Sequence, residues 1–381
     1  MLTKKYHIMK TLQNHFFLKF IITPCLLLIF SISSLAQIPF ENEYAFGLDL
    51  SFLKSHEDNN DKYYDIDGVQ KPALEIFRQY GYNWGRVMIC NEPTDRLPQT
   101  LDYVIASAQQ LKNNGYKFLL DYMFSNGWAN PMTQPTPAAW VELSHSDRVE
   151  AVYQYVHHTM KSLKEADVMP DIVQIGNEIG NGFLWPDGRI YYDNTGVSQW
   201  KNVADYLSAG IRAIREVAGK EHKVKIMLHV DHGGDIPMTQ TFFDNMKEYK
   251  VEYDVIGFSF YPWSHGTLLD LRDNLNFTAL CYNKEIILIE TGYYWQPSRY
   301  FRDGQMPPFP ETPEGQRQWL EAVNELVLAT PNGLGKGIFW WEPMMGRRGY
   351  FDENGKVQPI IQALKKYSLP IKRADGQTRI Q

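Results

Sequence analysis

The chain has 381 residues, and its 44 acidic side chains outnumber its 38 lysines and arginines, for a formal net charge of −6. No run of basic residues interrupts this acidic balance, so nucleic acid is not an expected partner. Three cysteines are too few for a disulfide scaffold. The fold must therefore rest on an apolar core, and the length suits one large domain.

The first 36 residues have the pattern of a secretion signal. Lys4, Lys5, Lys10 and Lys19 precede a mostly apolar stretch, 21–35, and Ala36 follows it. A retained membrane anchor is the alternative, but the apolar stretch is short for a membrane span. We expect cleavage after Ala36, with no span left in the mature chain, and export to the periplasm or the extracellular space. The product is a monomer with one catalytic domain at 37–381 and a net charge of −10.

Beyond the signal, short apolar strands alternate with amphipathic helices. The expected strands are Phe46–Leu50, Trp84–Ile89, Tyr116–Tyr122, Ile172–Ile175, Val224–Val230, Val255–Phe260, Ile286–Ile289 and Gly337–Trp341. The expected helices are Pro72–Tyr80, Thr100–Asn113, Ser146–Ala166, Gln199–Val217, Met238–Lys247, Thr267–Tyr282, Pro313–Ala329 and a last one near Gln358–Tyr367.

Eight strands that alternate with eight helices predict an α/β fold with a parallel sheet closed into a (β/α)₈ TIM barrel. A doubly wound open sheet is the alternative. It is disfavoured because residues 47–51 after the first strand lack the glycine spacing of a phosphate-binding loop. In a barrel, chemistry lies at the carboxyl ends of the strands, and this predicts where catalytic side chains should be sought.

Two of these strands end in a glutamate. Residues 172–186 read IVQIGNEIGNGFLWP and present Asn177 and Glu178 after the fourth strand, while Glu290 follows the apolar stretch 286–289. Either glutamate alone could simply solvate a loop. Two carboxylates at the same end of one barrel instead suggest a paired-carboxylate glycosidase. Ten tryptophans and 23 tyrosines agree with this, although most of these rings could belong to the core.

The pair has an expected division of labour. Glu178 is assigned as the acid/base because the Asn177 amide beside it can bind a sugar hydroxyl, and Glu290 is assigned as the nucleophile. Arg86 could keep Glu290 ionised, although a salt bridge with Glu92 or Asp95 is an equal alternative. Tyr261 could donate a further hydrogen bond or be a plain aromatic residue at a strand end.

Other chemistries find less support in the sequence. His229, Asp231, His232 and Asp235 lie close together, but their spacing matches no strong metal motif, so no metal and no cofactor are expected. Cys90 and Cys281 are interpreted as structural thiols, with a single disulfide between them as the alternative. No Gly-x-Ser-x-Gly motif is present.

The chain resembles glycoside hydrolase family 53, the endo-β-1,4-galactanases, from about Gly47 to its last helix. The resemblance rests on LLDYMFSNGWANP, PDIVQIGNEIGNGFLWP, IMLHVDHGG, DVIGFSFYPWSHGTLLDLRDNL, IILIETGYYW and GIFWWEP. It implies a retaining (β/α)₈ enzyme in which Glu178 is the acid/base and Glu290 the nucleophile. Substrate binding is expected from Asp49, Arg86, Trp128, Asn177, Trp185, His229, Asp231, Tyr261 and Trp341.

The chain also departs from that family. Met123 and Asn126 stand where the family usually has a His and an Asp beside the cleaved sugar, and Asn130 replaces a second Asp. The loop 293–313 lacks the acidic, glycine-rich run that binds calcium in some members, so structural calcium is possible but unsupported. The favoured function is hydrolysis of β-1,4-galactan, the polysaccharide partner. A different β-linked polysaccharide and a catalytically weak carbohydrate-binding barrel are the two alternatives.

Overall fold

The computed structural model describes residues 44–93, 97–192, 195–301 and 306–367. The expected secretion signal at 1–36 lies outside these ranges. Among the described residues, no helix is long and apolar enough to cross a membrane.

The strands of the barrel follow the expected positions closely. They are β1 (Ala45–Asp49), β2 (Trp84–Ile89), β3 (Lys117–Tyr122), β4 (Ile172–Ile175), β5 (Lys225–Val230), β6 (Val255–Phe260), β7 (Glu285–Thr291) and β8 (Gly335–Trp340). Each strand pairs in parallel with its neighbour in sequence, and β8 pairs with β1, which closes the barrel. The expected (β/α)₈ barrel is therefore confirmed, and the open doubly wound sheet is wrong.

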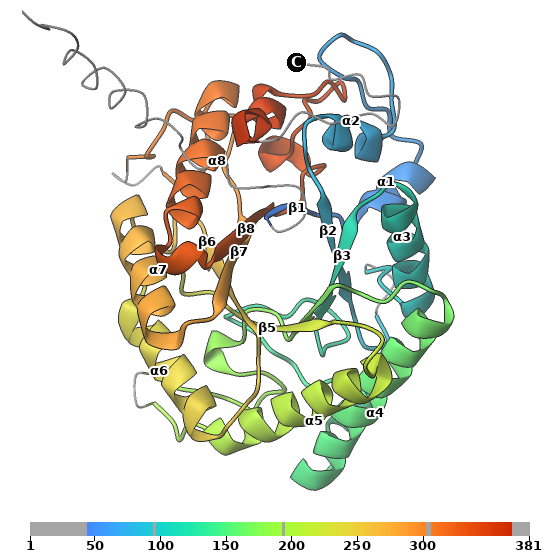
Figure 1. The fold of residues 1–381 in the computed structure, drawn as a ribbon, viewed down its shortest axis with the longest axis vertical. Coiled ribbons are helices and arrows are strands. Elements are labelled where there is room, and N and C mark those ends of the chain that lie inside the picture. The colour runs from blue at the N-terminus through green and yellow to red at the C-terminus, as the bar shows by residue number, and fades with distance from the viewer. Residues whose placement is uncertain (1–43, 94–96, 193–194, 302–305, 368–381) are drawn as a thin grey trace, which may run out of the picture. The chain divides into compact units, whose positions relative to one another are not determined.

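Helices surround the strands on the outside of the barrel (Figure 1). They are α1 (Leu53–Asp58), α2 (Ala73–Gln79), α3 (Leu101–Asn113), α4 (His145–Glu165), α5 (Trp200–Ala218), α6 (Ile236–Glu248), α7 (Leu268–Tyr282) and α8 (Pro313–Leu328). Five of them begin after a side chain that accepts a hydrogen bond from a backbone N–H of the first turn, and these caps are Thr100, Ser144, Asp235, Thr267 and Thr312. The cap residues explain why the helix starts were readable from the sequence.

Two elements differ from expectation. The short helix α1 was not predicted, because its six residues carry no side-chain cap and only Leu53 is buried. The last expected helix, near 358–367, is instead two 3₁₀ turns, Pro359–Gln362 and Lys365–Tyr367. The two turns are short, of four and three residues, and the C-cap Ala363 lies between them.

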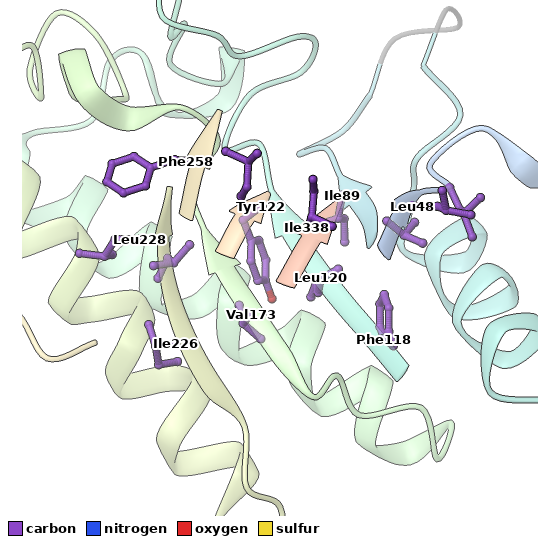
Figure 2. Packing of buried hydrophobic residues seen from close by; sticks show 14 of the residues in the cluster. Leu48, Ile89, Phe118, Leu120, Tyr122, Val173, Ile226, Leu228, Phe258 and Ile338 are labelled. Atoms are coloured by element: carbon purple, nitrogen blue, oxygen red, sulfur yellow. The ribbon is translucent and has the colours of Figure 1, made fainter. Parts of the chain in front are cut away.

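Alternate strand residues divide the core into two parts. Residues that point outward pack between the strands and the helices, as Figure 2 shows for Leu48, Leu120, Val173, Leu228 and Ile338. Residues that point inward fill the lower barrel, and they are Ala45, Trp84, Leu119, Ile172, Met227, Val255, Ile287, Ile289 and Phe339. Gly47 belongs to this interior, because a Cβ there would lie 2.2 Å from the Phe339 ring. The apolar fill of the lower barrel leaves the carboxyl ends of the strands for polar side chains.

Candidate active site

A layer of polar side chains lies directly above the apolar fill. Counting two residues along the strands from Trp84, Leu119, Ile172, Met227 and Gly257 reaches Arg86, Asp121, Gln174, His229 and Ser259, which are all buried. Buried polar groups at successive inward positions must satisfy one another, because no water surrounds them. We call these five residues the polar layer.

Arg86 is the cation of this layer. Its guanidinium donates to Asp49 Oδ2 at 2.6 Å and to Asp121 Oδ2 at 2.9 Å, and it lies 2.9 Å from Glu290 Oε1. Glu92 is not a partner of Arg86 among the described residues, and Asp95, the other acidic residue of the local alternative, lies outside them. Removing the Arg86 side chain would leave three buried carboxyl groups without their cation. Breaking a buried ion pair in this way lowers the free energy of unfolding by about 3–5 kcal/mol.

Glu290 is held from two sides at the carboxyl end of β7. Besides its ion pair with Arg86, its Oε2 accepts a hydrogen bond of 3.2 Å from the Tyr261 hydroxyl. The strand runs to Thr291, so Glu290 lies inside β7 instead of after it, at an irregularity in its pairing with β6. Burial raises the pKa of Glu290, while Arg86 and Tyr261 oppose that rise and favour the carboxylate.

Glu178 has a different environment. It accepts a 2.8 Å hydrogen bond from the Ser259 hydroxyl, and no arginine or lysine of the described ranges forms an ion pair with it. Burial, with the charges of Glu290 and Asp231, raises the pKa of Glu178 well above its usual range. Its backbone is left-handed, with φ of 49°, a conformation that is uncommon for a residue with a side chain and that occurs at functional sites. The surroundings thus favour a protonated Glu178 beside a more easily ionised Glu290.

His229 connects the polar layer to Glu178. Its Nδ1 accepts from the Glu178 backbone N–H at 3.3 Å and lies 3.0 Å from Gln174 Nε2, so Nε2 carries the proton toward Ser259 Oγ, 2.9 Å away. Burial lowers the pKa of His229 well below its usual range, so the ring is neutral. It has no exposed surface. His229 thus contacts Ser259, which in turn donates to Glu178, and its expected contact with substrate stays a prediction.

The Asn177 amide is largely used by the protein. Its Oδ1 accepts from Arg86 at 2.7 Å, and its Nδ2 donates to the carbonyl oxygen of Ala129 at 2.8 Å. One hydrogen on Nδ2 remains for a sugar hydroxyl. Asp49 is likewise buried, and its carboxylate accepts from Arg86 and from the Ser51 N–H.

Aromatic residues surround the carboxyl ends of the strands. Trp128 is 41 % exposed, and its ring centroid is 6.4 Å from that of Trp341, which directly follows β8. Trp185 is half-buried, and its indole N–H donates to the carbonyl oxygen of Asn181. The half-buried Tyr261 ring stacks on Trp263 at 5.2 Å. Rings of this kind, partly covered and close to polar groups, suit the apolar faces of sugars.

Asp231 is buried beside His232. One of its oxygens lies 3.0 Å from His232 Nδ1, and the other is buried without a hydrogen-bond partner. Within the described ranges, no three His, Cys, Asp or Glu side chains are grouped so as to hold a metal ion. Cys90 is buried and Cys281 exposed, and both are free thiols, so the alternative of a disulfide between them is wrong.

Three residues of the site carried no assigned role in the sequence: Gln174, Ser259 and Glu342. Glu342 follows Trp341 with φ of 54°, is 1 % exposed, and has a buried Oε1 without a hydrogen-bond partner. Burial and Asp49 raise its pKa well above the usual range, so this carboxyl group is neutral. Gln174 and Ser259 could have been found as polar residues at inward positions of otherwise apolar strands.

The loop after β3 makes structural use of its unusual residues. Met123 packs in an apolar cluster with Met88, Cys90, Leu97 and Ala129. Asn126 Nδ2 donates to the carbonyl oxygens of residues 91 and 92, at 2.5 and 3.1 Å, and its Oδ1 accepts from the Ala138 N–H at 2.7 Å. Asn126 therefore joins the loop after β2 to a later part of its own loop, the connection between β3 and α4.

This arrangement predicts the cost of an aspartate at position 126. Asn126→Asp would face two carbonyl oxygens with a carboxylate, so we expect a loss of about 1–3 kcal/mol in the free energy of unfolding, measured by urea denaturation. Asn130→Asp is the matched control, because the Asn130 side chain only accepts, from the Met132 and Thr133 N–H groups. Equal stability of the two variants would contradict the bridging role of Asn126.

Comparisons with known proteins agree with this geometry. The family model of Glycosyl hydrolase family 53 matches residues 45–368. The chain belongs to glycosyl hydrolase family 53. As a member of this family it is a glycoside hydrolase.

Named relatives cover most of the chain. It is 37 % identical to an "Uncharacterized protein in bgaB 5'region" of Niallia circulans, over 80 % of this chain and 84 % of that protein. It is 33 % identical to the arabinogalactan endo-β-1,4-galactanase of Thermothelomyces thermophilus, over 78 % of this chain and 88 % of that protein.

Solved structures of the family superpose well. The catalytic domain of the family 53 protein from Ignisphaera aggregans matches with a TM-score of 0.76 at 29 % identity, over 84 % of this chain and 95 % of that one. A structure from a study of two fungal β-1,4-galactanases gives the same TM-score and identity, over 84 % of this chain and 98 % of that one.

Proposed function

We propose that this glycoside hydrolase is an exported endo-acting enzyme that cleaves β-1,4-galactosidic bonds in galactan, the galactose side chain of pectin, with retention of configuration. The observation that carries the proposal is the unequal environment of two buried carboxyl groups. Glu290 lies against Arg86 and a tyrosine hydroxyl, while Glu178 has only a serine hydroxyl. The named galactanases among its relatives support galactan as the substrate.

In the first chemical step, Glu290 attacks the anomeric carbon while Glu178 gives its proton to the leaving oxygen. Arg86 and Tyr261 stabilise the Glu290 carboxylate before attack, which keeps the nucleophile ionised without a metal. The proton remains on Glu178 because burial and the neighbouring negative charges disfavour its ionisation.

In the second step, Glu178 has lost its proton and can take one from water, which then attacks the glycosyl–Glu290 ester. Once Glu290 is esterified, its negative charge is gone, so the pKa of Glu178 falls and Glu178, whose proton has left with the departing alcohol, stays ionised and ready to act as the base. Ser259, oriented by neutral His229, keeps Glu178 in place through both steps.

Two inversions predict overall retention. Proton NMR during the first minutes of galactan hydrolysis should show the β-anomer at the new reducing end, with the α-anomer appearing later by mutarotation. An initial α-anomer would exclude a glycosyl–enzyme intermediate and overturn the assignment of Glu290.

A further inference from the structure

Three arginines lie on the loops that follow β7 and β8, next to the nucleophile. Arg299 and Arg347 are exposed and Arg348 is half-buried, and we call these three residues the arginine rim. A Cβ placed on Gly292, two residues after Glu290, would lie 3.8 Å from Arg348 Cδ and 3.2 Å from Tyr261 Cε1. Arg348 therefore runs past the tyrosine that donates to Glu290.

Aromatic rings contact two of the three arginines. The Arg348 guanidinium lies 4.3 Å from the centroid of Trp341 and 5.6 Å from that of Tyr294, and the Arg299 guanidinium lies 5.3 Å from that of Tyr300 and forms a side-chain hydrogen bond with this tyrosine. The Trp295 backbone N–H donates to the Arg347 carbonyl oxygen at 3.0 Å, which joins the two loops. Stacking on Trp341 fixes the plane of the Arg348 guanidinium and leaves its N–H edge available for an anion.

No carboxylate of the described chain neutralises these charges. None of the three arginines comes within 4.0 Å of an Asp or Glu oxygen in the described ranges, whereas Arg148, Arg215 and Arg317 each do. Arg348 lowers the pKa of Glu342, but burial and Asp49 raise that pKa well above its usual range. In a chain of net charge −6, three arginines without a carboxylate partner among the described residues form a positively charged surface to which an anion can bind.

We propose that the arginine rim is a subsite for the carboxylate of a uronic acid carried by the polysaccharide substrate. This inference rests on the proposed function and adds to it that the preferred galactan is acidic. A planar carboxylate matches the two parallel N–H groups of a guanidinium, and it is the usual anionic group of a sugar oxidised at C6. Because the three guanidiniums lie on two joined loops, the arginine rim can bind a uronate carboxylate whose position along the polysaccharide varies.

The test compares one substrate in two forms. Galacto-oligosaccharides that carry a uronic acid branch are prepared with the free carboxylate and with the carboxylate reduced to an alcohol. For the unaltered enzyme we expect kcat/KM to be at least about tenfold higher on the carboxylate form. This preference should shrink as the salt concentration rises, because the arginines are accessible to solvent.

Variants assign the preference to the rim. Arg347→Gln with Arg348→Gln should bring the ratio of the two kcat/KM values to nearly one, and Arg347→Gln alone, at an exposed position, should lower it without any threat to folding. Arg212→Gln is the matched control, because Arg212 is also exposed and stacked on a tyrosine, at 4.5 Å, but lies on α5 near Glu216. It should keep the full ratio.

The outcomes separate this inference from the proposed function. If the unaltered enzyme hydrolyses both forms equally well, the uronate subsite is wrong and the galactanase stands. If the ratio is high but unchanged in the rim variants, another part of the cleft binds the carboxylate, and the inference is also wrong. If neither these oligosaccharides nor unsubstituted galactan are hydrolysed, the proposed function itself fails.

Discussion

Glu178→Gln should lower kcat/KM on galactan by about 10²–10⁴-fold, the usual contribution of a general acid. On an aryl β-galactoside with a good leaving group, the first step should remain fast, because that leaving group departs without a proton. The glycosyl–enzyme should then accumulate, since the same residue must activate water in the second step. Stopped-flow measurement of the aryl alcohol would show a burst followed by a slow steady rate.

The pH dependence adds an independent readout. Burial, Glu290 and Asp231 raise the pKa of Glu178. Its protonated form, and with it galactan hydrolysis, should therefore persist at pH values well above those at which an ordinary carboxyl group loses its proton. Activity is then lost as the pH rises through that raised pKa. In Glu178→Gln this alkaline limb should disappear from the profile of kcat/KM for the residual hydrolysis of galactan, while the acidic limb of Glu290 remains. An unchanged alkaline limb would assign the acid role to another group.

Much of the fold was readable because its signals are local. Strands such as Trp84–Ile89 and Val255–Phe260 are short and apolar, and their expected bounds equal the observed ones. Capping side chains such as Thr267 and Thr312 mark helix starts within three residues of sequence. By contrast, α1 has no cap and gains its place from the packing of Leu53, which sequence periodicity over six residues cannot reveal.

The site was partly readable for the same reason. Glu178 and Glu290 were recognisable because each follows an apolar run, and Arg86 because a charge inside a strand needs partners. Which partners it finds, Asp49 and Asp121, depends on the order and register of the strands, which place β1 and β3 on either side of β2. The contacts of His229 with Ser259 and Gln174 were not readable from the sequence, because a polar residue at an inward position can serve a neighbouring side chain as well as a ligand.

The third-strand loop shows a further limit. The sequence marked Met123 and Asn126 as departures from the family and left their effect open. In the structure, Met123 fills an apolar cluster and Asn126 joins the loop after β2 to a later part of the loop after β3. The arginine rim was equally hidden, because Arg299 and the pair Arg347–Arg348 lie on two loops that only the neighbouring strands β7 and β8 bring together.

Glu290→Ala should lower kcat by at least about 10⁴-fold on galactan and on activated aryl substrates alike, because no other group can form the covalent intermediate. The fold should survive, since Arg86 keeps its ion pairs with Asp49 and Asp121. Glu285→Gln is the matched control: it lies at the other end of the same strand, where it pairs with Lys225 at 2.6 Å, and its activity should equal that of the unaltered enzyme.

Added azide gives the sharpest readout for this variant. The methyl group of alanine leaves room where the carboxylate was, so a small anion can attack the anomeric carbon from that side while Glu178 still supplies the proton. A single inversion then yields an α-galactosyl azide from an activated β-galactoside, whereas attack from the Glu178 side of the sugar would yield the β-azide. Restored turnover with the α-product, identified by NMR, would place Glu290 on the face of attack. A β-azide from Glu290→Ala would mean that the roles of the two glutamates are reversed.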